Sequence, residues 1–301
     1  MCSSADVHSA RNFPWRFSIG LVLIGFLWIL SFVGINSVLL PAKVSFVDPV
    51  HKEVVVGQLA MVSMAVAAVA NIMFGLLSDA LHAILGKRLP WVVFGSLGSS
   101  LATLLLISGQ TVGELFIYWS LYHLFLNAIV APIMAIIADL VPSAARGTVS
   151  ALYSLGSMVG GSLSVVISAH YIGSANQLGI GLAICAIAVG ACAPVAYIAI
   201  REPKLPKRKS LSLEFRRSIW GKLRIPAVGA KNYYLVLLGK LLVIAATSMV
   251  SVFQLYIVTD YVGLSVVETS ATRECNGIDW ARWRGTLFGC GGAPFRHFSK
   301  T

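Results

Sequence analysis

The feature that most constrains this chain is a series of seven apolar stretches, each long enough to cross a bilayer. A helix needs about 20 apolar residues to span a hydrocarbon core that is roughly 30 Å thick. Hydrophobic residues make up 57% of the 301 residues and charged residues only 12%, a balance that excludes a disordered chain and almost any soluble enzyme. The sequence therefore predicts an all-α integral membrane protein. The stretches lie near Phe17–Leu40, Gly57–Ser78, Trp91–Ser108, Glu114–Leu140, Val149–Ile172, Leu178–Ile200 and Tyr233–Val258.

The spacing of these stretches predicts six helices in one bundle, followed by a basic linker and a seventh helix. Short loops join the first six, and short loops make sequential helices antiparallel neighbours. The linker contains Leu211–Leu223, which fits either a basic helix on the inner leaflet or a solvated segment. The expected parts are an N-terminal segment 1–16, a six-helix transmembrane bundle 17–200, a linker 201–232, a seventh transmembrane helix 233–258 and a non-helical tail 259–301.

The distribution of cations predicts that the N-terminus lies in the cytoplasm. With that orientation the inner side holds fifteen of the 23 Lys and Arg residues and the outer side two, and ten of the fifteen lie between Arg201 and Lys231. Cytoplasmic loops of membrane proteins collect cations. We therefore read the net charge of +11 as a sign of a multi-pass protein of the cell (inner) membrane, with the lipid bilayer and not a nucleic acid as its partner. The five cysteines are scattered without metal-ligand spacing, so we expect no metal site.

The first cytoplasmic loop carries charges at the ends of two helices. It reads GLLSD over 75–79 and GKRLPW over 86–91. We expect Gly75 to permit close approach of helix backbones. We expect Asp79, Lys87 and Arg88 to pair with one another or with helix dipoles, and Gly86 to belong to the same loop motif.

A second cytoplasmic loop reads IADLVP over 137–142, followed by Arg146 and Gly147. Asp139 ends the fourth helix and Arg146 begins the fifth, so we expect an ion pair between them. Farther along the fifth helix, Gly156 and Gly160 form a small-residue face that predicts close packing against another helix.

These motifs together resemble the major facilitator superfamily, over about residues 12–266. The first loop resembles G-x-L-S-D followed by G-R-R-x-P-W, the form found in the sugar–cation symporter branch, with Ala80 where an arginine is usual. The second resembles D-L-V-P-x-x-x-R-G, and FQLYIVTDYVG over 253–263 resembles the outer end of helix seven in sugar symporters. The resemblance implies a conformational switch built from Gly75, Asp79, Gly86, Lys87, Arg88, Asp139 and Arg146.

The same resemblance implies a solute cavity between two six-helix bundles, and polar residues deep in helices are candidates to line it. His123 and Asn127 are four residues apart and share a helix face. They are candidates for solute binding, with interhelical hydrogen bonding as the alternative. Trp119 could stack on a sugar ring or serve packing alone. Asn71 is a further polar residue at this depth, for which helix–helix contact is the stronger reading. The candidate solute-binding residues are Asn36, Trp119, His123, Asn127 and Gln254.

The coupling ion stays open at the level of sequence. Sugar symporters carry acidic residues inside helices two and four, whereas here helix two has none and helix four has Glu114 and Asp139 only at its ends. Among Asp, Glu, His, Lys and Arg, His123 is the one residue away from the rims of the first six spans. Coupling to H⁺ or Na⁺ and uncoupled transport both remain possible readings, and we expect no cofactor.

We therefore expect a secondary-active or facilitative transporter of a small solute, a sugar or glycoside, that works by alternating access. A full member of the family has twelve helices, so we expect this chain to be truncated, with an out-of-frame tail after Val266 or, alternatively, a natural terminal domain. A missing half or a second chain would then complete the path. The alternative function is a non-transporting membrane remnant or interaction protein. An intramembrane enzyme is disfavoured because His123 has no acidic partner within the spans.

Overall fold

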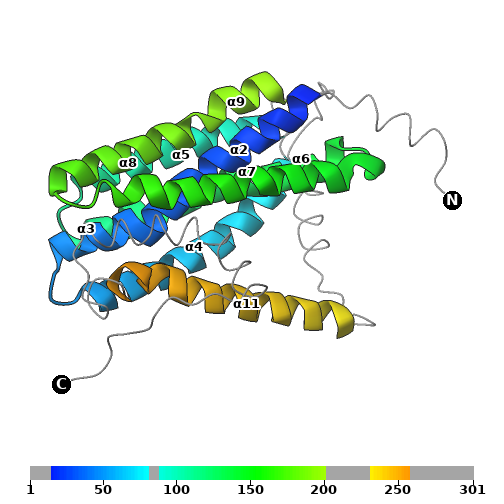
Figure 1. Cartoon of the computed structure of the whole chain (residues 1–301). Helices are drawn as coiled ribbons and strands as arrows, with labels where there is room; N and C mark the ends of the chain where they lie inside the picture. Colours follow the sequence, from blue (N-terminus) through cyan, green and yellow to red (C-terminus); the bar gives the residue numbers. More distant parts are fainter. Residues whose placement is uncertain (1–14, 81–87, 201–230, 258–301) are drawn as a thin grey trace, which may run out of the picture.

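The computed structural model describes residues 15–80, 88–200 and 231–257, and within these ranges it contains helices and no strands (Figure 1). The all-α fold class is confirmed. The predicted tail, and nearly all of the predicted linker and N-terminal segment, lie outside the described residues. The helices are α2 (Trp15–Gly34), η1 (Ile35–Leu39), α3 (Leu40–Val47), α4 (Lys52–Ala80), α5 (Leu89–Ser108), α6 (Val112–Leu140), α7 (Ser143–Ala169), α8 (Ala175–Gly190), α9 (Cys192–Ala199) and α11 (Lys231–Tyr256).

Within the described ranges, six helical spans are long and apolar enough to cross a membrane. They coincide with the first six predicted stretches to within a few residues at most ends, and the first span runs on to Val47. The helix α11 occupies the place predicted for the seventh helix.

The first span is one continuous run, Trp15–Val47, in which five residues have π-helical geometry. This π-helix, η1, comes immediately before Pro41, the second residue of α3. Proline has no backbone N–H and its ring crowds the preceding turn, so the helix must change its hydrogen-bond pattern there. Asn36 therefore lies in a widened turn, a geometry that is frequent at functional sites.

The sixth span is broken at Ala191 into α8 and α9, where the sequence had predicted one helix. Pro194 explains the break. Its ring clashes with the carbonyl of the residue four positions earlier, which is Gly190, the last residue of α8.

Close packing of α7 against α2 holds one side of the bundle together. A Cβ atom built at Gly156 would clash with the backbone oxygen of Val22, and one at Gly160 would clash with that of Phe26. Ser164 adds a buried hydrogen bond to the carbonyl of Leu30. The prediction that this glycine face permits close helix packing is confirmed, and its partner is α2.

The helix α6 is the most buried of the six spans, and it packs mainly against α5 and α4. The backbone of α5 approaches it closely at Gly95, where an added Cβ would stand 2.7 Å from the carbonyl oxygen of Phe125. A buried hydrogen-bond contact of 3.1 Å between Ser31 and Tyr122 joins α6 to α2. Because α2 and α6 meet in the interior, polar side chains on their facing surfaces are held away from lipid.

The helix α11 contacts the bundle mainly through its C-terminal end, beside η1, α3 and α4 (Figure 1). Leu255 and Tyr256 are buried there, whereas Leu238 and Leu242, nearer the N-terminal end, are exposed. The hydroxyl of Tyr256 donates a buried hydrogen bond of 2.8 Å to the carbonyl of Pro41.

Candidate functional site

Aromatic and polar side chains gather where α6 faces α2. We call this group the α2–α6 cluster; it consists of Ser31, Phe32, Trp119, Tyr122 and His123. The His123 ring stands nearly perpendicular to the rings of Trp119 and Phe32, with centroid distances of 4.6 and 5.7 Å. Helical spacing explains the arrangement, because residues three and four apart on α6 share the face that meets α2.

Two nitrogens of the cluster are buried without a hydrogen-bond partner among the described residues. They are Nε1 of Trp119 and Nε2 of His123, on side chains that are 1% and 4% exposed. Leaving a buried donor or acceptor unpaired costs about 1–3 kcal/mol. The cluster therefore holds two buried polar groups whose hydrogen bonds no described residue supplies.

Asn127 lies one turn beyond His123 and joins α6 to α4. Its Nδ2 donates to the backbone carbonyl of His123 over 2.8 Å, and its Oδ1 accepts from Nδ2 of Asn71 over 3.1 Å. The structure thus supports, for Asn127, the interhelical hydrogen bonding that the sequence left open as an alternative. Its amide nitrogen and oxygen are both engaged.

The structure brings together three of the five residues predicted to bind solute, namely Trp119, His123 and Asn127. Asn36 is half-buried in η1, and within the described residues no hydrogen bond links its side chain to the other three. Gln254 lies in α11, and its side chain is outside the described residues. Sequence reasoning missed Ser31 and Phe32, although Phe32 stands four residues before Asn36 on the same helix.

An ion pair joins the two cytoplasmic motifs. Nη2 of Arg88, immediately before α5, lies 2.8 Å from Oδ2 of Asp139 in the last turn of α6. The expected pair between Asp139 and Arg146 is corrected by this geometry. Arg146 instead donates to the carbonyls of Ala138 and Val141, at 2.9 and 3.3 Å. Arg88 reaches Asp139 because α5 and α6 run antiparallel, so that the start of α5 meets the end of α6. Arg146 lies near the C-terminus of α6, where a cation binds the free carbonyls of the last turn.

The remaining motif residues are only partly described. An added Cβ at Gly75 would meet no atom within 4 Å, so the close approach expected there is not made within the described residues. The side chain of Asp79, and all of Gly86 and Lys87, lie outside the described residues.

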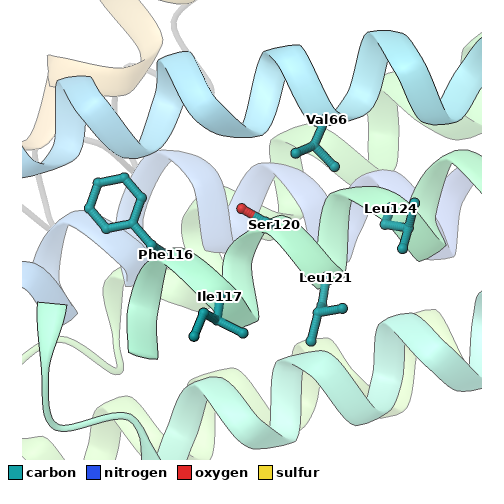
Figure 2. Close-up of a pocket in the computed structure, with 6 residues that line it drawn as sticks. All are labelled: Val66, Phe116, Ile117, Ser120, Leu121 and Leu124. Carbon is teal, nitrogen blue, oxygen red and sulfur yellow. The ribbon is translucent and has the colours of Figure 1, made fainter. Parts of the chain in front are cut away.

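An apolar groove of about 390 Å³ runs between α4 and α6, and Figure 2 shows its lining. Ser120 is its one polar lining residue, and none of the five predicted solute-binding residues belongs to it. The groove lining consists of Val66, Phe116, Ile117, Ser120, Leu121 and Leu124.

Within the described residues, no group of three or more His, Cys, Asp or Glu side chains could hold a metal ion.

Comparison with known proteins gives the family. A family model described as the Major Facilitator Superfamily matches residues 17–272. A search of curated proteins gave no match. The matched range contains the Arg88–Asp139 pair, α11 and all six spans except the first two residues of the first one. The chain therefore belongs to the major facilitator superfamily, a family of multi-pass membrane transporters.

Proposed function

We propose that this transporter carries a small uncharged solute rich in hydroxyl groups, a sugar or glycoside, by alternating access. The observation that carries the proposal is the pair of unpartnered nitrogens on Trp119 and His123, set among aromatic rings. Hydroxyl groups would supply the missing hydrogen bonds, and the apolar face of a sugar ring would stack on aromatic surfaces. The cluster contains no charged side chain, which favours a neutral solute over an ion.

We propose that the cytoplasmic motifs act as the conformational switch. The Arg88–Asp139 pair ties the start of α5 to the end of α6 at 2.8 Å. A contact of this kind shifts the equilibrium only if it is stronger in one conformation than in the other. Gly75, Asp79, Gly86, Lys87 and Arg146 would belong to the same switch.

The proposal places the protein in the cell membrane with the N-terminus in the cytoplasm. It requires a second bundle opposite this one, supplied by a further segment or by a second chain. If transport is coupled to H⁺, His123 is the group through which a proton would act, because no other Asp, Glu, His, Lys or Arg lies away from the ends of the six spans. Uncoupled, facilitative transport needs no such group.

Ligand-dependent stabilisation tests the solute class. The protein in lipid nanodiscs would be heated with glucose, xylose, sucrose or a phenyl β-glucoside, and with alanine and citrate as charged comparators. At a solute concentration of 100 times Kd, binding stabilises the folded state by about 2.7 kcal/mol. We expect at least one sugar to raise the melting temperature in wild type.

Variants locate the site within that experiment. We expect Trp119→Ala to abolish the sugar-dependent rise, whereas Trp15→Ala, at a side chain that is 71% exposed, preserves it. Stabilisation by the charged comparators alone, with none from any sugar, would contradict the proposed solute class.

A further inference from the structure

Asn71 is an exposed amide in the interior of α4, far from both helix ends. One turn before it stand Ala67 and Ala68, and one turn after it stands Gly75. A Cβ at Gly75 would meet nothing within 4 Å. Of the four residues one turn from Asn71 on α4, three are therefore small, and the fourth, Phe74, is buried.

The side-chain nitrogen of Asn71 is held by a hydrogen bond to α6. Its Nδ2 donates to Oδ1 of Asn127 over 3.1 Å, and Nδ2 of Asn127 donates to the carbonyl of His123 over 2.8 Å. These two bonds form a chain from α4 to the α2–α6 cluster. Within the described part of the molecule, no hydrogen bond reaches Oδ1 of Asn71.

An exposed amide at membrane depth must face either lipid or a polar path. Facing lipid would leave its carbonyl unsatisfied, and a polar group without a hydrogen bond in hydrocarbon costs several kcal/mol. Polar side chains within membrane spans accordingly face the bundle interior or a water-filled cavity. A role in joining α4 to α6 explains the hydrogen bond of Nδ2 of Asn71. It does not explain the side-chain carbonyl of Asn71, which takes no part in that bond.

We propose that Asn71 contacts the solute through its side-chain carbonyl and that Asn127 is a positioning residue that orients it. This inference rests on the proposed transport function. It assigns the contact with the solute to Asn71 in place of Asn127. Asn127, whose amide nitrogen and oxygen are both engaged, does not reach the solute. The matching solute group is an uncharged hydrogen-bond donor, a hydroxyl, that meets Oδ1 of Asn71.

Cysteine labelling tests the exposure of Asn71 without any solute. Asn71→Cys and Leu101→Cys would be made in a full chain whose five native cysteines are replaced by alanine, and each would be reconstituted in nanodiscs. Leu101 is the control because it lies in the interior of α5 and is 59% exposed. A thiol reacts as the thiolate, which needs water, so we expect a membrane-impermeant methanethiosulfonate to modify position 71 about tenfold faster than position 101. Equal, slow rates at both positions would overturn the proposal.

Uptake kinetics test the two roles. Proteoliposomes would be assayed with ¹⁴C-labelled glucose, xylose and sucrose. We expect Asn71→Ala to raise KM about tenfold with Vmax unchanged, because it removes ground-state binding. Asn127→Ala should raise KM by a similar factor, and the double variant should be no worse than either single one, because both changes break the same chain of contacts. Gln58→Ala, an exposed polar residue near the start of α4, is the control and should leave KM unchanged.

The outcomes separate this inference from the transport proposal. Unchanged KM in both alanine variants, or effects that multiply in the double variant, would overturn the assignment while leaving a sugar transporter. Failure of the wild type to take up any of the sugars would count against the transport proposal. The labelling rates would still decide whether Asn71 faces a water-filled path.

Discussion

At the scale of single residues, the Arg88–Asp139 pair combines a buried cation with a carboxylate in contact with solvent. The side chain of Arg88 is 6% exposed and that of Asp139 is 51% exposed. A pair with one solvated partner adds little stability, because water competes for the carboxylate and screens the attraction. Its value to the molecule lies in linking two helix ends, which makes it suited to switching more than to stabilising.

Asp139→Asn tests that distinction. We expect the apparent free energy of unfolding to fall by about 1–3 kcal/mol, because the buried guanidinium of Arg88 loses this charged partner. We expect the maximal rate of uptake to fall by about tenfold or more, because the balance between the two conformations shifts. Thermal unfolding and uptake in the same preparation would measure both. A large loss of stability with an unchanged uptake rate would show that the pair is structural.

Predictions about residues on one helix and predictions about contacts between two helices rest on different information. The sequence predicts that His123 and Asn127 share one face because helical spacing is local information. The partners of Asn127 and Asp139, which are Asn71 and Arg88, depend on which helices are neighbours. That information is tertiary, and a single sequence without repeats does not supply it.

At the scale of elements, the α2–α7 contact depends on the absence of side chains on α7. The atoms that a Cβ at Gly160 would meet belong to the backbone of Phe26, which cannot move aside without separating the helices. Such small-residue contacts are a main source of helix association in membranes. Burial of apolar side chains gives no hydrophobic driving force there, because lipid tails are as apolar as the protein interior.

Gly160→Ala should therefore destabilise the bundle by about 1–3 kcal/mol, the usual cost of overpacking. Gly147→Ala is the matched control on the same helix, because a Cβ there would meet nothing within 4 Å. It should be neutral or stabilise by about 0.5–1 kcal/mol through its better helix propensity. Melting temperatures of both variants in one detergent would measure the difference, and equal shifts would contradict the close contact.

The attachment of α11 gives a second element-level prediction. Tyr256→Phe removes the hydroxyl that donates to the carbonyl of Pro41 and should weaken docking of α11 by about 1 kcal/mol. Tyr197→Phe, at a side chain that is 61% exposed on α9, is the control and should have no effect. Cys substitutions at Ser45 and Leu255 would be made in chains that carry Tyr256→Phe, Tyr197→Phe or neither. The rate of disulfide formation between them would measure how well α11 docks on the bundle. Equal cross-linking in all variants would contradict the role of this bond.

The elements themselves were largely predictable, because a run of about 20 apolar residues fixes a span through its length and hydropathy. The breaks within spans were not predicted. Pro41 and Pro194 were available as signals, yet proline is tolerated in membrane helices, so its presence does not say whether a helix bends, widens into a π-helix or breaks.

At the scale of the whole molecule, the asymmetry of Lys and Arg predicts an N-terminus in the cytoplasm. A direct test uses single cysteines at Val50, in the loop between α3 and α4, and at Ser143, at the start of α7, in sealed right-side-out vesicles. We expect an impermeant maleimide to label position 50 from outside and position 143 only after permeabilisation. The reverse pattern would contradict the cation-based orientation.

We propose above that this member of the major facilitator superfamily moves an uncharged sugar-like solute across a membrane. The most direct measurement is uptake of ¹⁴C-labelled glucose, xylose and sucrose into proteoliposomes that contain the full chain, with empty liposomes and the Trp119→Ala variant alongside. We expect saturable uptake of at least one sugar by wild type, and uptake by the variant no greater than that of empty liposomes. Uptake by wild type that equals that of empty liposomes for every sugar would contradict it.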